Sequence, residues 1–114
     1  MNITVGSKTF TATLDTGPTV TAFRKLLPLT VTMADLNRNE KFVDLPVALP
    51  TNTGSPGRIQ GGDLMLYGSR TLVVFYEPFT TTYRYTRLGR INDASGLAAA
   101  LGAGDVKVTF TLQP

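Results

Sequence analysis

The 114-residue sequence contains no cysteine and no histidine. Without cysteine the chain forms no disulfide and offers no thiol nucleophile or thiolate ligand, so cysteine usage says nothing about its redox compartment. Without histidine it lacks the side chain that most often serves as a general base near neutral pH or binds a transition metal. Serine and cysteine triads are therefore excluded, and we expect no metal and no cofactor. Any enzyme chemistry would use carboxylates, hydroxyls, arginine or shape.

Charge of either sign is also sparse. Eleven Lys and Arg residues stand against eight Asp and Glu, and the net charge of +3 is spread along the chain. Nucleic-acid-binding proteins typically carry a concentrated basic stripe with interleaved aromatics, so we expect no nucleic-acid partner. No stretch approaches the roughly 20 apolar residues of a membrane span, and residues 1–4 lack the features of a signal peptide. We expect no membrane association, a cytoplasmic location if the chain is complete, and export if a leader was removed.

What the sequence does contain is threonine that alternates with apolar residues, the period-two pattern of half-buried strands. The alternation is clearest over residues 9–14 and 106–112. Gly6-Ser7 is a glycine-first pair that suits a type II′ turn, so residues 2–14 are predicted to form a β-hairpin. The length suits a single domain that spans residues 1–114.

Proline, glycine and asparagine mark the remaining elements. Pro18 fits the first position of a short amphipathic helix, which Pro28 prevents from continuing. Asp93 is expected to cap a second helix that stops at Gly102. Residues 44–62 are rich in Pro and Gly and predict a long, functional or mobile loop that could include one helical turn. The predicted strands after the first hairpin are residues 29–37, 40–43, 64–67, 71–76, 83–91 and 106–112, with a glycine-first turn at Gly68-Ser69.

Together these elements predict a mostly β fold with about eight strands and two short helices. Closing short strands into a barrel removes the exposed edges, and two helices can plug its ends. Residues 72–75 (Leu-Val-Val-Phe) are apolar on both faces and are expected to form the most buried strand. We therefore expect a closed barrel filled by its own aliphatic and aromatic side chains.

Several segments together resemble a known family. They are residues 23–37, which include Phe-Arg-Lys-Leu-Leu-Pro-Leu and Ala-Asp-Leu-Asn, and residues 44–46, 62–64, 73–76 and 85–91. These segments resemble the small prokaryotic cyclophilin-like proteins, a group with no assigned biochemical role. The resemblance implies an eight-stranded cyclophilin-like β-barrel in a minimal form. It also implies flavodoxin-like partner domains in some relatives.

One motif is similar to a segment of the true cyclophilins, which isomerise peptidyl-proline bonds. Residues 59–63 (Ile-Gln-Gly-Gly-Asp) match the segment in which, by that resemblance, the glutamine faces the substrate backbone. True cyclophilins also carry an arginine and a pocket phenylalanine shortly before this glutamine, where this chain has its Pro/Gly loop. The catalytic candidates are therefore Gln60 with Arg58 or Arg87 as a substitute arginine. The alternative is a strand start that glycine permits, with Asp63 bonding local amides.

The densest group of cations and aromatics lies in the predicted strand 83–91. On one strand, Tyr83, Tyr85, Arg87 and Ile91 would share one face, and Arg84 and Arg90 would lie on the other. Arg87 between tyrosines could clamp a carboxylate or phosphate or stack on a planar ligand. The alternative is a solvated strand whose tyrosines cover arginine stems.

Other aromatic and acidic residues have simpler interpretations. Tyr67 and Phe75 are expected to pack in the core and at its rim, and they complete the candidate ligand-binding set. Asp35, Glu40 and Asp44 match no calcium motif and fit the adjacent turns. The candidate ligand-binding residues are Gln60, Tyr67, Phe75, Tyr83, Tyr85 and Arg87.

From these observations the sequence predicts a non-catalytic accessory module that binds an unidentified small molecule or peptide. The first alternative is a weak peptidyl-prolyl cis-trans isomerase. It would need no covalent step, because the X–Pro bond only has to rotate over a barrier of roughly 18–20 kcal/mol. The second alternative is the structural half of a fusion or complex.

Overall fold

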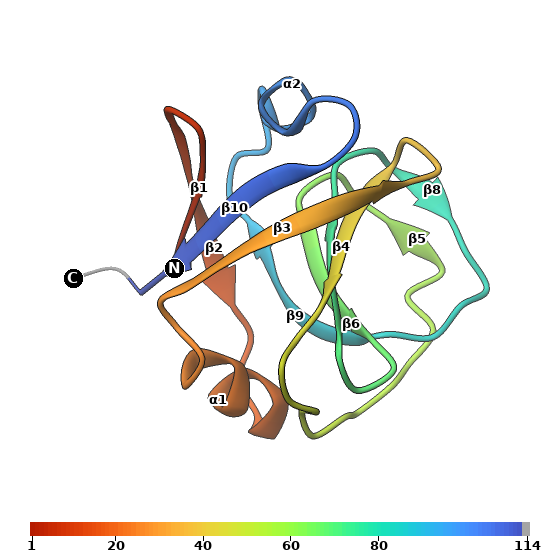
Figure 1. Ribbon diagram of the computed structural model, residues 1–114. Helices are drawn as coiled ribbons and strands as arrows, with labels where there is room; N and C mark the ends of the chain where they lie inside the picture. Colours follow the sequence, from red (N-terminus) through yellow and green to blue (C-terminus); the bar gives the residue numbers. More distant parts are fainter. Residues whose placement is uncertain (113–114) are drawn as a thin grey trace.

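Eight strands close into one antiparallel barrel in the computed structural model, which describes residues 1–112. Around the barrel the strands follow the order β1-β10-β3-β4-β7-β6-β9-β2 (Figure 1). A separate two-stranded sheet pairs β5 with β8. The prediction of a closed, mostly β barrel with about eight strands is confirmed.

The barrel strands are β1 (Asn2–Val5), β2 (Lys8–Leu14), β3 (Leu29–Leu36), β4 (Glu40–Asp44), β6 (Asp63–Tyr67), β7 (Thr71–Phe75), β9 (Thr86–Ile91) and β10 (Val106–Thr111). The small sheet contains β5 (Arg58–Ile59) and β8 (Phe79–Thr80). The helices are α1 (Pro18–Arg24) and α2 (Leu97–Leu101), which lie on opposite sides of the barrel in Figure 1. Among the described residues 1–112, no helix is long and apolar enough to cross a membrane.

The hairpin turns follow from their residues. Val5 pairs with Lys8 across the two-residue turn, in which Gly6 has a φ of 58°, so the predicted first hairpin is confirmed. The turn between β6 and β7 contains three residues, 68–70, one more than the glycine-first pair predicts. Asn37 and Arg38 both adopt positive φ between β3 and β4, as a type I′ turn requires.

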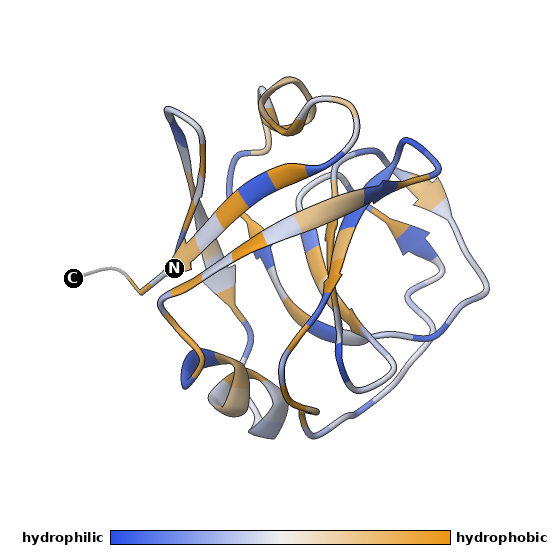
Figure 2. Ribbon diagram, in the orientation of Figure 1, coloured by the Kyte–Doolittle hydropathy of each residue, from blue (hydrophilic) through white to orange (hydrophobic). Residues whose placement is uncertain are grey.

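The main core fills the barrel with alternate side chains from each strand. Along β10, Val108 and Phe110 are buried while Lys107 is exposed, and the alternation is visible as bands of colour in Figure 2. All four residues from Leu72 to Phe75 are buried, as expected for the most buried strand. Phe23 from α1 meets Phe110 edge-to-face at a centroid distance of 6.2 Å, which places the helix against the barrel interior.

One glycine allows the barrel to close between β2 and β9. Gly89 pairs with Leu14, and a Cβ atom at Gly89 would lie 2.2 Å from the backbone oxygen of Thr13. No side chain fits at that distance. The close approach of the two backbones therefore requires glycine at this position.

Both helices differ from the prediction at one end. α1 begins at Pro18 as expected but ends at Arg24, and Leu26 and Leu27 continue in hydrogen-bonded turns. α2 stops at Gly102 as expected, but its N-cap is Gly96. Asp93 instead accepts a hydrogen bond from the backbone N–H of Ser95 at 3.0 Å, so it closes the preceding turn. The prediction that Asp93 caps α2 is therefore wrong.

The Pro/Gly segment 44–62 has more structure than predicted. It contains β5, a bridge between Gly54 and Tyr85, and no helical turn. The Thr19 hydroxyl donates to the Pro50 carbonyl at 2.6 Å, and Arg70 donates to the carbonyl oxygens at positions 45 and 46. These bonds fix residues 45–50 against α1 and the turn between β6 and β7.

Candidate functional site

A second hydrophobic cluster lies on the outer face of the barrel, beneath β5 and β8. Leu64, Leu66, Leu72 and Val74 belong to the main core. Side chains alternate along a strand, so the residues between them face outward. The outer cluster consists of Ile59, Met65, Val73, Phe75 and Tyr85, with Phe42 and Phe79 packed against it. The small sheet therefore shields apolar side chains that the barrel does not enclose.

Two clefts border the outer cluster, and Tyr85 lines both of them. We call them the arginine cleft and the tyrosine cleft. The arginine cleft has a volume of about 510 Å³ and is lined by residues that include Asp15, Arg58, Met65, Tyr85 and Arg87. The tyrosine cleft has a volume of about 480 Å³ and is lined by residues that include Asn39, Glu40, Tyr67, Tyr83 and Tyr85.

In the arginine cleft, the charge of Arg87 is already shared. Its guanidinium lies 3.6 Å from a carboxylate oxygen of Asp15 and 3.8 Å from one of Asp63. The Arg87 side chain is 45% exposed. An incoming anion would have to compete with these two carboxylates for the guanidinium.

Gln60 lies outside both clefts, unlike Arg58 and Arg87. Its backbone N–H donates to a carboxylate oxygen of Asp63 at 2.9 Å, and the backbone N–H of Asp63 donates to the Gln60 carbonyl at 3.1 Å. Gly62 has a φ of 97° in the same turn. The contacts of residues 60–63 are therefore those of the local-turn alternative, in which Asp63 bonds nearby amides.

The strand that carries Arg87 begins later than predicted. β9 starts at Thr86, three residues after Tyr83. Leu64 pairs with Gly89 and Met65 with Arg87, so Leu88 is an extra residue in a bulge. The bulge shifts the alternation, so Arg87 and Arg90 are both exposed while Ile91 is in the main core. The prediction that Ile91 shares a face with Arg87 and that Arg90 lies opposite is therefore wrong.

Three tyrosines form the wall of the tyrosine cleft. The ring centroids of Tyr67 and Tyr83 lie 6.1 Å apart at 79°, and those of Tyr67 and Tyr85 lie 5.6 Å apart at 59°. Tyr67 and Tyr83 are 47% and 62% exposed, whereas Tyr85 is buried. Phe75 packs edge-to-face behind Tyr85 at 5.5 Å and is fully buried, so it supports the wall and does not line either cleft.

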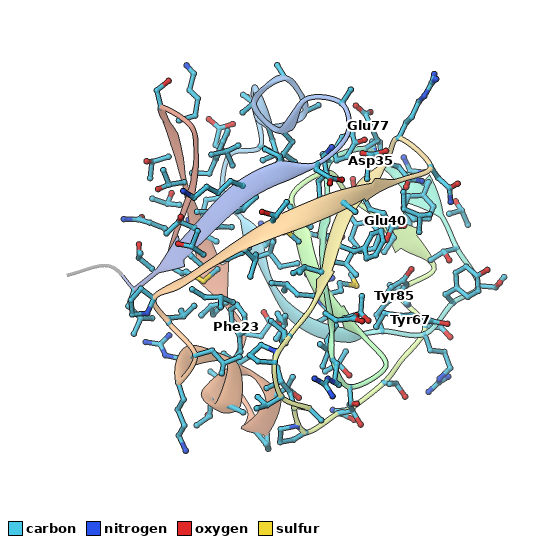
Figure 3. The ribbon with its side chains drawn as sticks, viewed as in Figure 1. Phe23, Asp35, Glu40, Tyr67, Glu77 and Tyr85 are labelled. Carbon is cyan, nitrogen blue, oxygen red and sulfur yellow. The ribbon has the colours of Figure 1, made fainter. Side chains whose placement is uncertain are left out.

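Glu40 lines the same cleft from β4. It pairs with Phe75 across the sheet and is only 8% exposed. Within residues 1–112 its carboxyl group has no hydrogen bond or ion pair. Burial, and secondarily the negative charge of Asp35, raises its pKa to about 7. Figure 3 shows Glu40, Tyr67 and Tyr85 on the same side of the barrel.

Glu40 also affects the pKa of Tyr85, which lines the same cleft. Burial raises the pKa of Tyr85 to about 12, and the charge of Glu40 is the next cause. The phenol is therefore neutral throughout the physiological range. The tyrosine cleft thus combines neutral aromatic surface with a single carboxyl group.

Sequence reasoning treated Glu40 only as a turn acid and did not place it with the tyrosines. The available signal was the strand period: residues 40 and 42 share a face of β4, and residue 42 is phenylalanine. An acid that shares a strand face with an aromatic residue indicates a carboxyl group beside apolar surface. The neighbouring tyrosines could not be added without the register of β4, β7 and β6.

Comparison with known proteins gives one positive result. A model described as the cyclophilin-like family matches residues 3–111. No curated protein and no solved structure matches the chain.

Proposed function

The chain belongs to the cyclophilin-like family, and from that premise we propose that it is a non-catalytic module that binds a small molecule or peptide on the outer wall of its barrel. The observation that carries this proposal is the position of Tyr85, which lines both clefts. A ligand in either cleft, or one that spans the two, would contact this ring. The arrangement supports recognition at the outer wall.

The tyrosine cleft has the character of a small-ligand site. Its volume of about 480 Å³ falls within the roughly 300–1,000 Å³ of typical ligand pockets, which combine apolar walls with a few polar groups. Exposed Tyr67 and Tyr83 provide large contact area at little entropic cost, because each has only two side-chain torsions. These properties favour binding here.

The polar groups at this wall support binding more than catalysis. Arg87 is engaged by Asp15 and Asp63, and Glu40 is the only carboxyl group among the described residues that line the tyrosine cleft. Proton transfer to and from a substrate usually relies on a second acid or base. The remaining polar side chains of the cleft are amides, phenols and one threonine hydroxyl.

A backbone NMR titration tests the proposal. We expect at least one probe from a set of n-butylammonium, butyrate, 1-butanol and a proline-containing tetrapeptide to shift amide resonances around residues 67, 83 and 85. Tyr83→Ala should weaken that binding. Val47→Ala, which removes another exposed side chain, should not. If every probe leaves these resonances unchanged, the binding proposal is contradicted, and the structural half of a complex becomes the better explanation.

The second candidate function is peptidyl-prolyl isomerisation. Its favouring observation is that Arg58 and Arg87 line a cleft that also contains the apolar side chain of Met65. An arginine that hydrogen-bonds the prolyl nitrogen would weaken amide resonance and ease rotation. Exchange NMR on a proline peptide decides between the two functions. The binding proposal expects the background rate, whereas a faster rate that Arg87→Gln abolishes would establish the isomerase.

A further inference from the structure

The tyrosine cleft presents acceptors that have no donor. Glu40 is only 8% exposed as a residue and lines the cleft, and its carboxyl group has no hydrogen-bond or ion-pair partner among residues 1–112. The side-chain oxygen of Asn39, which lines the same cleft, is also buried without a partner. Buried polar groups without partners are rare and costly in native proteins. An unpaired carboxyl group on a largely buried residue that lines a cleft, next to a second acceptor without a donor, indicates that a ligand supplies the donor.

Within the described chain, no lysine or arginine lines this cleft. The cation nearest in sequence is Lys41, and its side chain lies on the opposite, inner face of β4. There its ammonium donates to the carbonyl oxygens of Gly102 and Gly104. A protein with more basic than acidic residues thus leaves this carboxyl group without a counter-charge.

The walls of the cleft also favour a cation. The π-faces of aromatic rings attract positive charge, and partial removal of water strengthens that attraction. Tyr67, Tyr83 and Tyr85 lie against one another with centroid distances of 5.6 and 6.1 Å, so they form one continuous aromatic surface. An anion would face Glu40 with no donor to hold it. A neutral apolar ligand would bury the carboxylate still further.

We propose that the tyrosine cleft binds a small organic cation with a primary or secondary ammonium group. The N–H groups donate to the Glu40 carboxylate, and the positive charge and its carbon substituents lie against the tyrosine rings. Because an unpaired acceptor requires a donor, a protonated amine fits better than a quaternary ammonium. This inference rests on the binding role proposed above and names the chemical class of its ligand. The volume of about 480 Å³ suits a free amine.

The test compares small probes of similar size but different charge at pH 7.5 by the same NMR titration. n-Butylammonium should bind at least tenfold more tightly than 1-butanol, and tetramethylammonium should fall between them. Butyrate should leave the cleft resonances unchanged. A charge-assisted hydrogen bond to a largely desolvated carboxylate is sufficient for a factor of this size.

Two pairs of variants test which side chains bind the ammonium ion. Glu40→Gln should weaken n-butylammonium binding about tenfold or more, whereas Glu77→Gln, which removes an exposed carboxylate outside the cleft, should change it less than twofold. Tyr83→Leu should weaken binding severalfold while Tyr83→Phe retains it, because the ring face is what attracts the cation. The exposed Tyr83 pair keeps the test valid if the Glu40 variant folds poorly.

Different failures point to different conclusions. Equal binding of 1-butanol and n-butylammonium in the cleft would overturn the cation assignment while supporting the binding role. Silence of every probe would overturn both. Insensitivity to Glu40→Gln would also overturn the assignment. A capped lysine peptide that binds better than n-butylammonium would support the ammonium chemistry and overturn the assignment of a free amine as its source.

Discussion

Two adjacent ionisable residues lie on opposite faces of β4, and in the described part of the chain only one of them has partners for its charge. Lys41 is fully buried on the inner face, where its ammonium lies 3.1 Å from Asp35 and donates to two backbone carbonyls. Glu40 is almost as buried on the outer face, and within residues 1–112 it has no partner. One strand therefore carries both a compensated charge and an uncompensated one.

This difference distinguishes a charge that stabilises the fold from a charge that is available to a ligand. The Lys41 contacts connect β4 to the segment after α2, and the Tyr76 hydroxyl completes the group by donating to Asp35 at 2.5 Å. Hydrogen bonds from Tyr76, and secondarily from Lys41, lower the pKa of Asp35, which burial opposes. Nothing similar offsets the burial of Glu40. A residue that costs stability where it stands is a candidate for a role in binding.

The largest expected effect on stability comes from removing the charge of Lys41, which has partners in the folded protein. Lys41→Met keeps most of the side-chain length but leaves Asp35 without its counter-charge and the two carbonyl oxygens without their donor. Removing one member of a buried pair typically costs about 3–5 kcal/mol. We therefore expect urea denaturation to show the free energy of unfolding lowered by about 3 kcal/mol or more.

Lys107→Met is the matched control, because Lys107 is an exposed lysine on β10. It should change the free energy of unfolding by less than about 0.5 kcal/mol. A similar, small effect for both lysine variants would mean that the contacts of Lys41 do not hold the barrel end, and the contrast between the faces of β4 would disappear.

The next effect has the opposite sign. Glu40→Gln removes a buried charge that has no partner, so at pH 8 we expect the free energy of unfolding to rise by about 1–2 kcal/mol. The folded protein holds the Glu40 proton more tightly than the unfolded chain, since its pKa is raised from 4.5 to about 7. The contribution of Glu40 to the free energy of unfolding should therefore fall as the pH rises from about 4.5 to 7.

The glutamine variant lacks that titration. Its advantage over the wild type should be complete above pH 7 and vanish below about pH 4.5, where both side chains are neutral. Urea denaturation at pH 4, 5.5 and 8 measures the difference, and the other titrating groups cancel because they are common to both proteins. A constant difference across the three pH values would show that Glu40 is not a desolvated carboxylate.

Much of the fold could be predicted from local signals. Glycine-first turns and threonine alternation located the first hairpin and β10, and the residues that resemble the family indicated barrel closure. The element ends were less predictable, because tertiary contacts decide them: α1 stops at Arg24, and Gly54 pairs with Tyr85 before β9 begins.

The site was only partly accessible to such reasoning. Tyr67, Tyr83 and Tyr85 were selected, and the structure brings them together. Gln60 was selected for its motif, but it lies in a turn outside the clefts. Glu40 was missed because its burial depends on the pairing of β4 with β7 and on the aromatic side chains of separate segments. Burial of a charge is a property of the tertiary structure, which no single segment reports.

The smallest expected effect concerns Arg87, which lies between the two extremes. It faces Asp15 at 3.6 Å and Asp63 at 3.8 Å, but its side chain is 45% exposed. Water can therefore replace either partner, and partly exposed pairs contribute roughly 0–1 kcal/mol. Arg87→Gln should lower the free energy of unfolding by less than about 1 kcal/mol, and by less still in 0.5 M salt, which screens the pairs. Arg90→Gln, at an exposed arginine on the same strand, is the control. A loss above about 2 kcal/mol that salt does not reduce would show that Arg87, like Lys41, stabilises the fold. Its guanidinium would then not be available to bind a ligand in the arginine cleft.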